Sequence, residues 1–161
     1  MAGTRWPGWT RQRTLLLPVA PGQWPPPGEP LTVDGITLQP KRELHITLVG
    51  TALGRRLHAA AACGRIGRGA VRQAFEALDW TWSRTGRRAR LEAPPKRRGG
   101  PTRHALVEFV ELPAMAGFHA ALGRLLGCPL PVPPPHVTLY VAGTPRGIGL
   151  PDPDTLARYR R

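Results

Sequence analysis

Apolar and polar residues alternate in two stretches of the chain, LHITLVG at 44–50 and HVTLYVAG at 136–143. Successive side chains of a β-strand point to opposite faces, so this alternation predicts a strand in each stretch. One face of each strand is then apolar, while the other carries a histidine and, two positions later, a threonine. We expect the same polar pair twice, and expect Tyr140 on the polar face of the second strand.

The remaining pattern predicts short strands, a few helices and proline-rich loops. Further strands are expected at 14–19, 31–40 (around an Asp34-Gly35 turn), 79–84, 88–93 and 104–112, with a turn at Thr85-Gly86. Helices are expected at 51–78, interrupted by the glycines of 63–69, at 113–126, and from about Asp154. Residues 20–30 and 128–135 are proline-rich loops. This order predicts an α+β fold with one strand of the repeated motif in each half.

The chain has 161 residues, the size of one domain. Residues 1–13 are basic and are expected to form a mobile N-terminal arm, with residues 14–161 forming a single domain. The two cysteines, Cys63 and Cys128, lack metal-type spacing and are expected to be reduced. No stretch approaches the length of a membrane span. We therefore expect a cytoplasmic monomer that needs no metal and no membrane.

The net charge of +13 indicates a polyanionic partner, since 23 Lys and Arg stand against 10 Asp and Glu. Residues 84–103 include a single acidic residue, Glu92, and eight basic residues: Arg84, Arg87, Arg88, Arg90, Lys96, Arg97, Arg98 and Arg103. This segment either tracks RNA phosphates or is a solvated, mobile loop. Lys41, Arg42 and Arg103 are candidates for contact with a phosphate of the substrate, and Tyr140 is a candidate either for stacking on a base or for closing the pocket as a structural residue.

The repeated imidazole–hydroxyl pair also has an interpretation without a functional role, in which two edge strands simply expose histidine and threonine side chains. Yet HITL and HVTL, in opposite halves of a chain of this size, resemble the paired motif of the two-histidine (2H) phosphoesterase superfamily. Its LigT-like branch includes 2′-5′ RNA ligases and cyclic phosphodiesterases. The resemblance extends from about Leu15 to Leu150. The long proline-rich insertions and the very basic 84–103 region depart from the family pattern and leave the substrate subclass open.

This resemblance implies two similar lobes of antiparallel sheet with outer helices, facing each other across a central cleft. It also implies four functional residues: His45, Thr47, His136 and Thr138. The two imidazoles would act as base and acid on opposite sides of phosphorus. The resemblance favours His136 as the base and His45 as the acid. The threonine hydroxyls would bind phosphate oxygens.

The activity expected is opening of 2′,3′-cyclic phosphates, or of 2′-5′ linkages, on RNA or small nucleotides, without a cofactor. The reverse reaction, RNA end joining, uses the same groups. A rival hypothesis is a non-catalytic, basic RNA-binding protein, and a third is a structural protein in which the two motifs are incidental.

Overall fold

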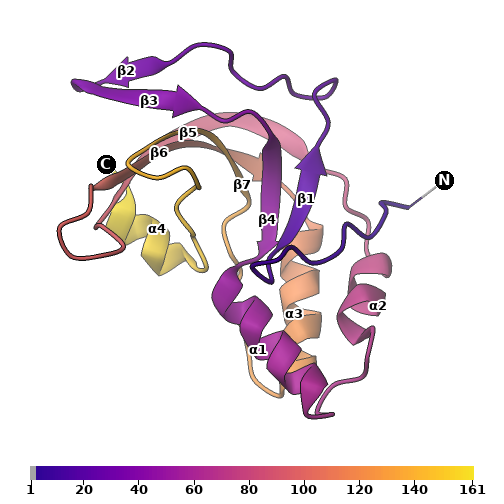
Figure 1. Ribbon diagram of the computed structural model, residues 1–161. Coiled ribbons are helices and arrows are strands. Elements are labelled where there is room, and N and C mark those ends of the chain that lie inside the picture. The colour runs from indigo at the N-terminus through magenta and orange to yellow at the C-terminus, as the bar shows by residue number, and fades with distance from the viewer. Residues whose placement is uncertain (1–2) are drawn as a thin grey trace.

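The computed structural model describes residues 3–161 as an α+β fold, a curled antiparallel sheet with four helices among those residues (Figure 1). The strands are β1 (Leu15–Val19), β2 (Leu31–Val33), β3 (Ile36–Pro40), β4 (Leu44–Val49), β5 (Ser83–Ala93), β6 (Arg103–Glu111) and β7 (His136–Ala142). The helices are α1 (Thr51–Ala62), α2 (Ala70–Glu76), α3 (Ala114–Leu126) and α4 (Pro153–Tyr159). Both predicted strands of the repeated motif are confirmed, as is the helix break at 63–69.

Strand β7 is the centre of the sheet. One of its edges pairs with β6, which in turn pairs with β5. Its other edge is shared by two strands, because Ile46 of β4 pairs with Val137 while Gln39 and Pro40 of β3 pair with Val141 and Tyr140. β1 flanks β4, and β2 flanks β3. Two strands from distant parts of the sequence, β4 and β7, are thereby direct neighbours.

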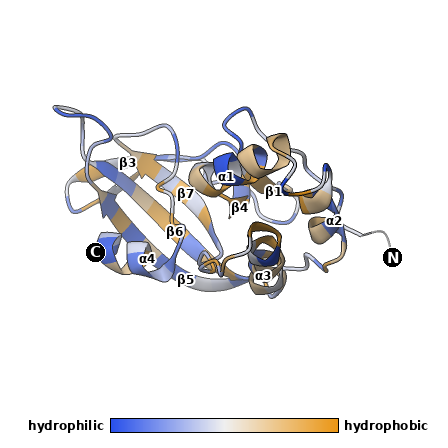
Figure 2. Cartoon of the chain, turned by 90° about the horizontal axis from the view of Figure 1, so that it is seen from below, coloured by the Kyte–Doolittle hydropathy of each residue, from blue (hydrophilic) through white to orange (hydrophobic). Residues whose placement is uncertain are grey.

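The buried residues form two hydrophobic clusters, and β7 contributes to both. The larger cluster joins the apolar side chains of β1 and β4 to helices α1, α2 and α3, which lie together in Figure 1, and includes Val137 and Leu139. The smaller cluster joins β5, β6 and Val141 to Ile148, Leu150 and α4. Figure 2 shows the alternating hydrophobic and hydrophilic bands of β5, β6 and β7 that this arrangement requires.

The N-terminal segment packs on the helices, where the sequence predicted a mobile arm. The Trp6 ring meets Phe75 of α2 edge-on, with centroids 5.3 Å apart, and Trp9 forms an isolated bridge with Leu15. Farther along, the carbonyl of Arg13 lies so close to Gly54 of α1 that a β-carbon there would be 1.7 Å from the Arg13 oxygen. Aromatic packing and a glycine contact therefore fix residues 6–13 against the larger cluster. The sequence did not predict this packing, because the segment is basic and has few apolar residues.

Residues 83–93 form one long strand, where the sequence predicted two strands and a turn at Thr85-Gly86. The pairing with β6 continues on both sides of an irregularity between Arg84 and Arg88, and Gly86 has a φ of 71°. A β-bulge accommodates a left-handed glycine without reversing the chain. Most of the basic 84–103 segment is therefore sheet rather than a mobile loop.

Candidate functional site

The register of β4 and β7 brings the two predicted motifs onto one side of the sheet. Ile46 pairs with Val137, and both side chains are fully buried in the larger cluster. Paired residues of an antiparallel sheet point to the same side, and their sequence neighbours point to the other. The neighbours on that opposite side are partly exposed, and they are His45, Thr47, His136 and Thr138. This set, which we call the four-residue face, unites all the predicted catalytic residues.

Continuing the register by one residue in each direction sets His45 opposite Thr138 and Thr47 opposite His136. The two imidazoles then occupy diagonal positions on either side of this pair, which are about 7–8 Å apart in regularly paired antiparallel strands and farther apart where the strands diverge. The electrostatics agree with this proximity, since a positive charge on His136 lowers the pKa of His45.

His136 has a defined tautomer when it is neutral. Its Nδ1 lies 2.8 Å from the carbonyl oxygen of Pro134. A carbonyl oxygen only accepts, so Nδ1 carries the proton and donates it to Pro134, which leaves a lone pair on Nε2. Burial lowers the pKa of His136 and outweighs the Pro134 hydrogen bond, which raises it. At neutral pH, His136 is therefore a neutral imidazole with Nε2 able to accept a proton.

His45 lies among mixed charges. Its pKa is lowered first by burial, then by the ammonium of Lys41 and by His136, while the carboxylate of Glu43 acts in the opposite direction. The ammonium of Lys41, and His136 whenever it is protonated, disfavour the imidazolium form of His45 in the free protein. A bound anion would reverse that balance, because an opposite charge favours the protonated ring.

The segment after β7 folds back over the four-residue face. A β-carbon added to Gly147 would lie 2.8 Å from Oγ1 of Thr138, so the backbone at Gly147 passes directly against the threonine side chain. The ammonium of Lys41 donates a hydrogen bond to the carbonyl oxygen of Pro145 at 3.1 Å. Ile148, buried in the smaller cluster, anchors the segment.

Tyr140 does not share the side of Thr138, which corrects the strict alternation predicted from the sequence. A register irregularity lies between Leu106 and Val107, so that Val107 pairs with Thr138 but Leu106 pairs with Tyr140. Leu106 and Val107 are neighbours on β6 and point to opposite sides. Tyr140 packs accordingly against the larger cluster, on the side of Leu139. Its position does not support the predicted stacking role.

The two predicted arginines differ in their relation to this face. Arg42 is exposed on the link between β3 and β4, three residues before His45. Arg103 begins β6, and its Nε donates to the carbonyl oxygen of Pro94 at 2.9 Å. The next residue, His104, pairs with Ala142, about 13 Å along β7 from Thr138. Arg103 is therefore remote from the four-residue face.

Several of the basic residues at 84–103 have acidic partners. Arg84 and Arg88 both bind the carboxylate of Glu108, which is 1% exposed, and Arg90 forms an ion pair with Asp34. The Arg84 hydrogen bond, followed by Arg88, lowers the pKa of Glu108 against the opposing effect of burial. The remaining cations of the segment are exposed: Arg87, Lys96, Arg97 and Arg98.

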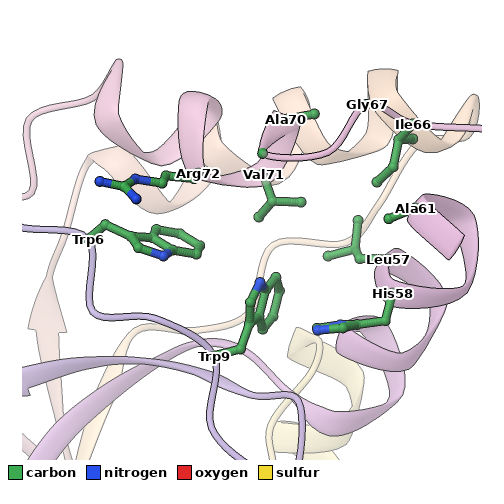
Figure 3. Close-up of a pocket in the computed structure, with 11 residues that line it drawn as sticks. Trp6, Trp9, Leu57, His58, Ala61, Ile66, Gly67, Ala70, Val71 and Arg72 are labelled. Carbon is green, nitrogen blue, oxygen red and sulfur yellow. The ribbon is translucent and has the colours of Figure 1, made fainter. Parts of the chain in front are cut away.

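A separate cavity of about 210 Å³ lies between the N-terminal segment and helices α1 and α2 (Figure 3). Its wall includes the rings of Trp6, Trp9 and His58, with Arg72 at its edge. Trp9 and His58 meet edge-on at 4.6 Å, and Nδ1 of His58 donates to the Gly54 carbonyl at 2.7 Å. No residue of the four-residue face lines this cavity.

Within residues 3–161, no three His, Cys, Asp or Glu side chains cluster in a way that could hold a metal ion. Over the same range, no helix is long and apolar enough to cross a membrane. Comparison of the chain with models of protein families, with curated proteins and with solved structures finds no match. Functional inference for this chain therefore depends on its own residues and geometry.

Proposed function

We propose that this protein is a 2H-type phosphoesterase that opens 2′,3′-cyclic phosphates on RNA or on small nucleotides without a metal ion. The observation that carries the proposal is the register Ile46–Val137, which turns His45, Thr47, His136 and Thr138 toward the same side of the sheet. Two imidazoles and two hydroxyls on one side of two adjacent strands match the groups that such a reaction needs.

In this proposal the fold has two lobes, β1 and β4 with α1–α3 and β5–β7 with α4, that meet at a cleft. Two features favour this division. The buried residues form two clusters, one centred on β1, β4 and α1–α3 and one on β5, β6 and α4, and β7 contributes to both. β4 and β7 share a single register pair, whereas β6 and β7 share six. Strands that diverge after one pair leave room between their polar side chains.

The reaction begins with His136. Its Nε2 accepts a proton from water, and the water oxygen attacks phosphorus as the new P–O bond forms. The opposite P–O bond to a ribose oxygen breaks, and protonated His45 donates its proton to that leaving oxygen. The product is a phosphate monoester beside a free hydroxyl. The two histidines have exchanged protonation states, and proton exchange with solvent restores them.

The assignment of the two roles follows from the environments of the rings. The Pro134 carbonyl holds the proton of His136 on Nδ1, so Nε2 is the free base. His45 lacks such a fixed tautomer, and its lowered pKa reflects burial, the ammonium of Lys41 and the coupling to the protonation of His136. A cyclic phosphate carries one negative charge, and its arrival raises the pKa of His45 toward the value an acid needs. Thr47 and Thr138 donate hydroxyl hydrogen bonds to the non-bridging oxygens.

A second function, RNA binding without catalysis, is favoured by the charge. The net charge is +13, and Arg87, Lys96, Arg97 and Arg98 remain exposed beyond the ion pairs of their segment. Such a surface binds polyanions in a salt-dependent way whether or not the histidines act. RNA end joining, the reverse of phosphodiester opening, would use the four-residue face with a 5′-hydroxyl in place of water.

Purified protein incubated with 2′,3′-cyclic nucleotides, with and without a chelator, tests the proposal. We expect hydrolysis in both conditions, and a loss of about 10²–10⁴-fold for His45→Ala and for His136→Ala. His58→Ala is a matched control, because His58 lies on α1 beside Trp9 and should leave the rate unchanged. Full activity in both site variants would refute the mechanism. RNA binding that neither variant alters, with no turnover, would favour the non-catalytic alternative.

A further inference from the structure

Lys41 lies beside the four-residue face although the motif does not include it. The backbone N–H of Lys41 donates to the carbonyl of Leu139 at 2.8 Å, which extends the pairing of β3 with β7 past the end of β3. Pro40, the preceding residue, pairs with Tyr140 on the side of the larger cluster. By alternation, Lys41 then points to the opposite side, the side of His45 and Thr138.

A hydrogen bond locates the ammonium group, and an electrostatic effect agrees with its position. The ammonium donates to the carbonyl oxygen of Pro145 at 3.1 Å, and two residues later Gly147 packs on Oγ1 of Thr138. It also lies near enough to His45 to lower the pKa of that imidazole. The ammonium of Lys41 thus lies between His45 and the segment of Pro145 and Gly147, which packs against Thr138.

The ammonium has unused capacity in this position. An ammonium has three donors, and the Pro145 carbonyl takes one of them. No carboxylate lies within ion-pair distance of Lys41 among residues 3–161. Around His45, the charged or titratable groups are Lys41, Glu43 and His136. A cation placed beside the His45 imidazole disfavours its protonation unless an anion arrives.

We infer that Lys41 is a phosphate-binding residue of the four-residue face, held in place by its hydrogen bond to Pro145. The inference rests on the proposed function for the identity of the ligand as a phosphate ester. The two free donors of the ammonium reach a non-bridging oxygen while the Pro145 bond keeps the long side chain from swinging into solvent. Bound phosphate then offsets the repulsion between Lys41 and protonated His45.

The test uses the full chain and inorganic phosphate as the probe. Imidazole NMR signals of His45 and His136 report phosphate binding in the unmodified protein, in Lys41→Met, in Lys41→Arg and in the control Arg55→Met. Arg55 is exposed on α1, a helix packed on the larger cluster, so its variant removes one charge without touching the site. If Lys41→Met fails to fold, Lys41→Gln replaces it, because its amide can still donate to Pro145.

We expect the phosphate dissociation constant to rise about tenfold in Lys41→Met, and to change by less than about twofold in Arg55→Met. Lys41→Arg should recover most of the affinity, since it restores a cationic donor. An equal loss in Lys41→Met and Arg55→Met would overturn the inference, as would a failure of phosphate to perturb either histidine in the unmodified protein.

The outcomes for the two proposals are separable. Phosphate binding that depends on Lys41, without hydrolysis of any cyclic phosphate, would refute the proposed reaction and leave the binding role of Lys41 standing. Hydrolysis that depends on His45 and His136, with unchanged phosphate affinity and KM in Lys41→Met, would do the reverse.

Discussion

Gly147 and Thr138 are in such close contact that a β-carbon on Gly147 would be 2.8 Å from the Thr138 hydroxyl oxygen and 3.5 Å from the Thr138 Cβ. The φ of Gly147 is not in the left-handed region, so the requirement for glycine here is spatial rather than conformational. The segment after β7 and the second motif strand are therefore fitted to each other. This contact joins the segment between β7 and α4 to the four-residue face.

Replacement of Gly147 by alanine should destabilise the protein by about 1–3 kcal/mol, as overpacking does, and should displace Thr138. Urea unfolding measures the first effect and the rate of cyclic phosphate hydrolysis the second. Gly149→Ala is the matched control, because nothing lies within 4 Å of a β-carbon at Gly149. Equal stabilities of the two variants would show that the contact with Thr138 relaxes freely.

Substitution of either threonine of the motif by valine should lower kcat by about 10²-fold, because each hydroxyl is proposed to stabilise charge on a non-bridging oxygen. Thr47→Val and Thr138→Val keep the shape of the side chain, and partly exposed sites tolerate the change. Thr37→Val, at an exposed position of β3 where Thr37 hydrogen-bonds only Thr32, serves as the control. A normal kcat in both site variants would remove the hydroxyls from the mechanism.

Removal of the Lys41 charge should raise the pKa of His45. Lys41 is the second-largest influence on that imidazole after burial, and it acts to lower the pKa. Titration of the His45 ring by NMR in Lys41→Met checks the direction, and Arg55→Met measures the effect of a distant charge. A His45 pKa that is lower in Lys41→Met, or unchanged, would contradict the proximity of the ammonium to the imidazole.

The ion pairs of Glu108 should make stability depend on pH in the acid range. Hydrogen bonds from Arg84 and Arg88 lower the pKa of Glu108 below its usual 4.5, so the folded state favours the carboxylate more than the unfolded chain does. The stabilisation is present above pH 4.5 and is lost as the pH falls through the lowered folded-state pKa. Glu108→Gln should cost about 1–3 kcal/mol at about pH 7, and progressively less as Glu108 becomes protonated.

Urea unfolding from neutral pH into the acid range, with Glu111→Gln as an exposed control, measures the difference. A penalty for Glu108→Gln that stays constant across that range would mean that the ionised carboxylate is not what stabilises the folded state.

The sequence predicted the strands and helix breaks that depend on short-range patterns of residues. The alternation in HITL and HVTL predicted β4 and β7, and the glycines at 63–69 predicted the break between α1 and α2. Given that β4 and β7 are neighbours, alternation places the histidine and threonine of both strands on the same side of the sheet. Sequence alone could not show the register that makes them so, because Ile46 and Val137 meet through tertiary packing.

The misplaced features share a non-local cause. Tyr140 lies on the other side because β6 and β7 slip in register between Leu106 and Val107, which depends on the partner strand. Gly86 sits in a bulge rather than a turn because β6 continues alongside it. Trp6 packs against Phe75 of α2, a contact between distant segments that composition cannot reveal.

The central claim is that both imidazoles act on one phosphorus atom, and kinetics of the double variant tests this most directly. Hydrolysis of a 2′,3′-cyclic nucleotide would be measured for His45→Ala, His136→Ala and the two changes combined. Groups that act as a unit give strongly non-additive losses, so we predict that the double variant is about as slow as either single variant. Losses that multiply, or single variants that keep the unmodified rate, would contradict the account.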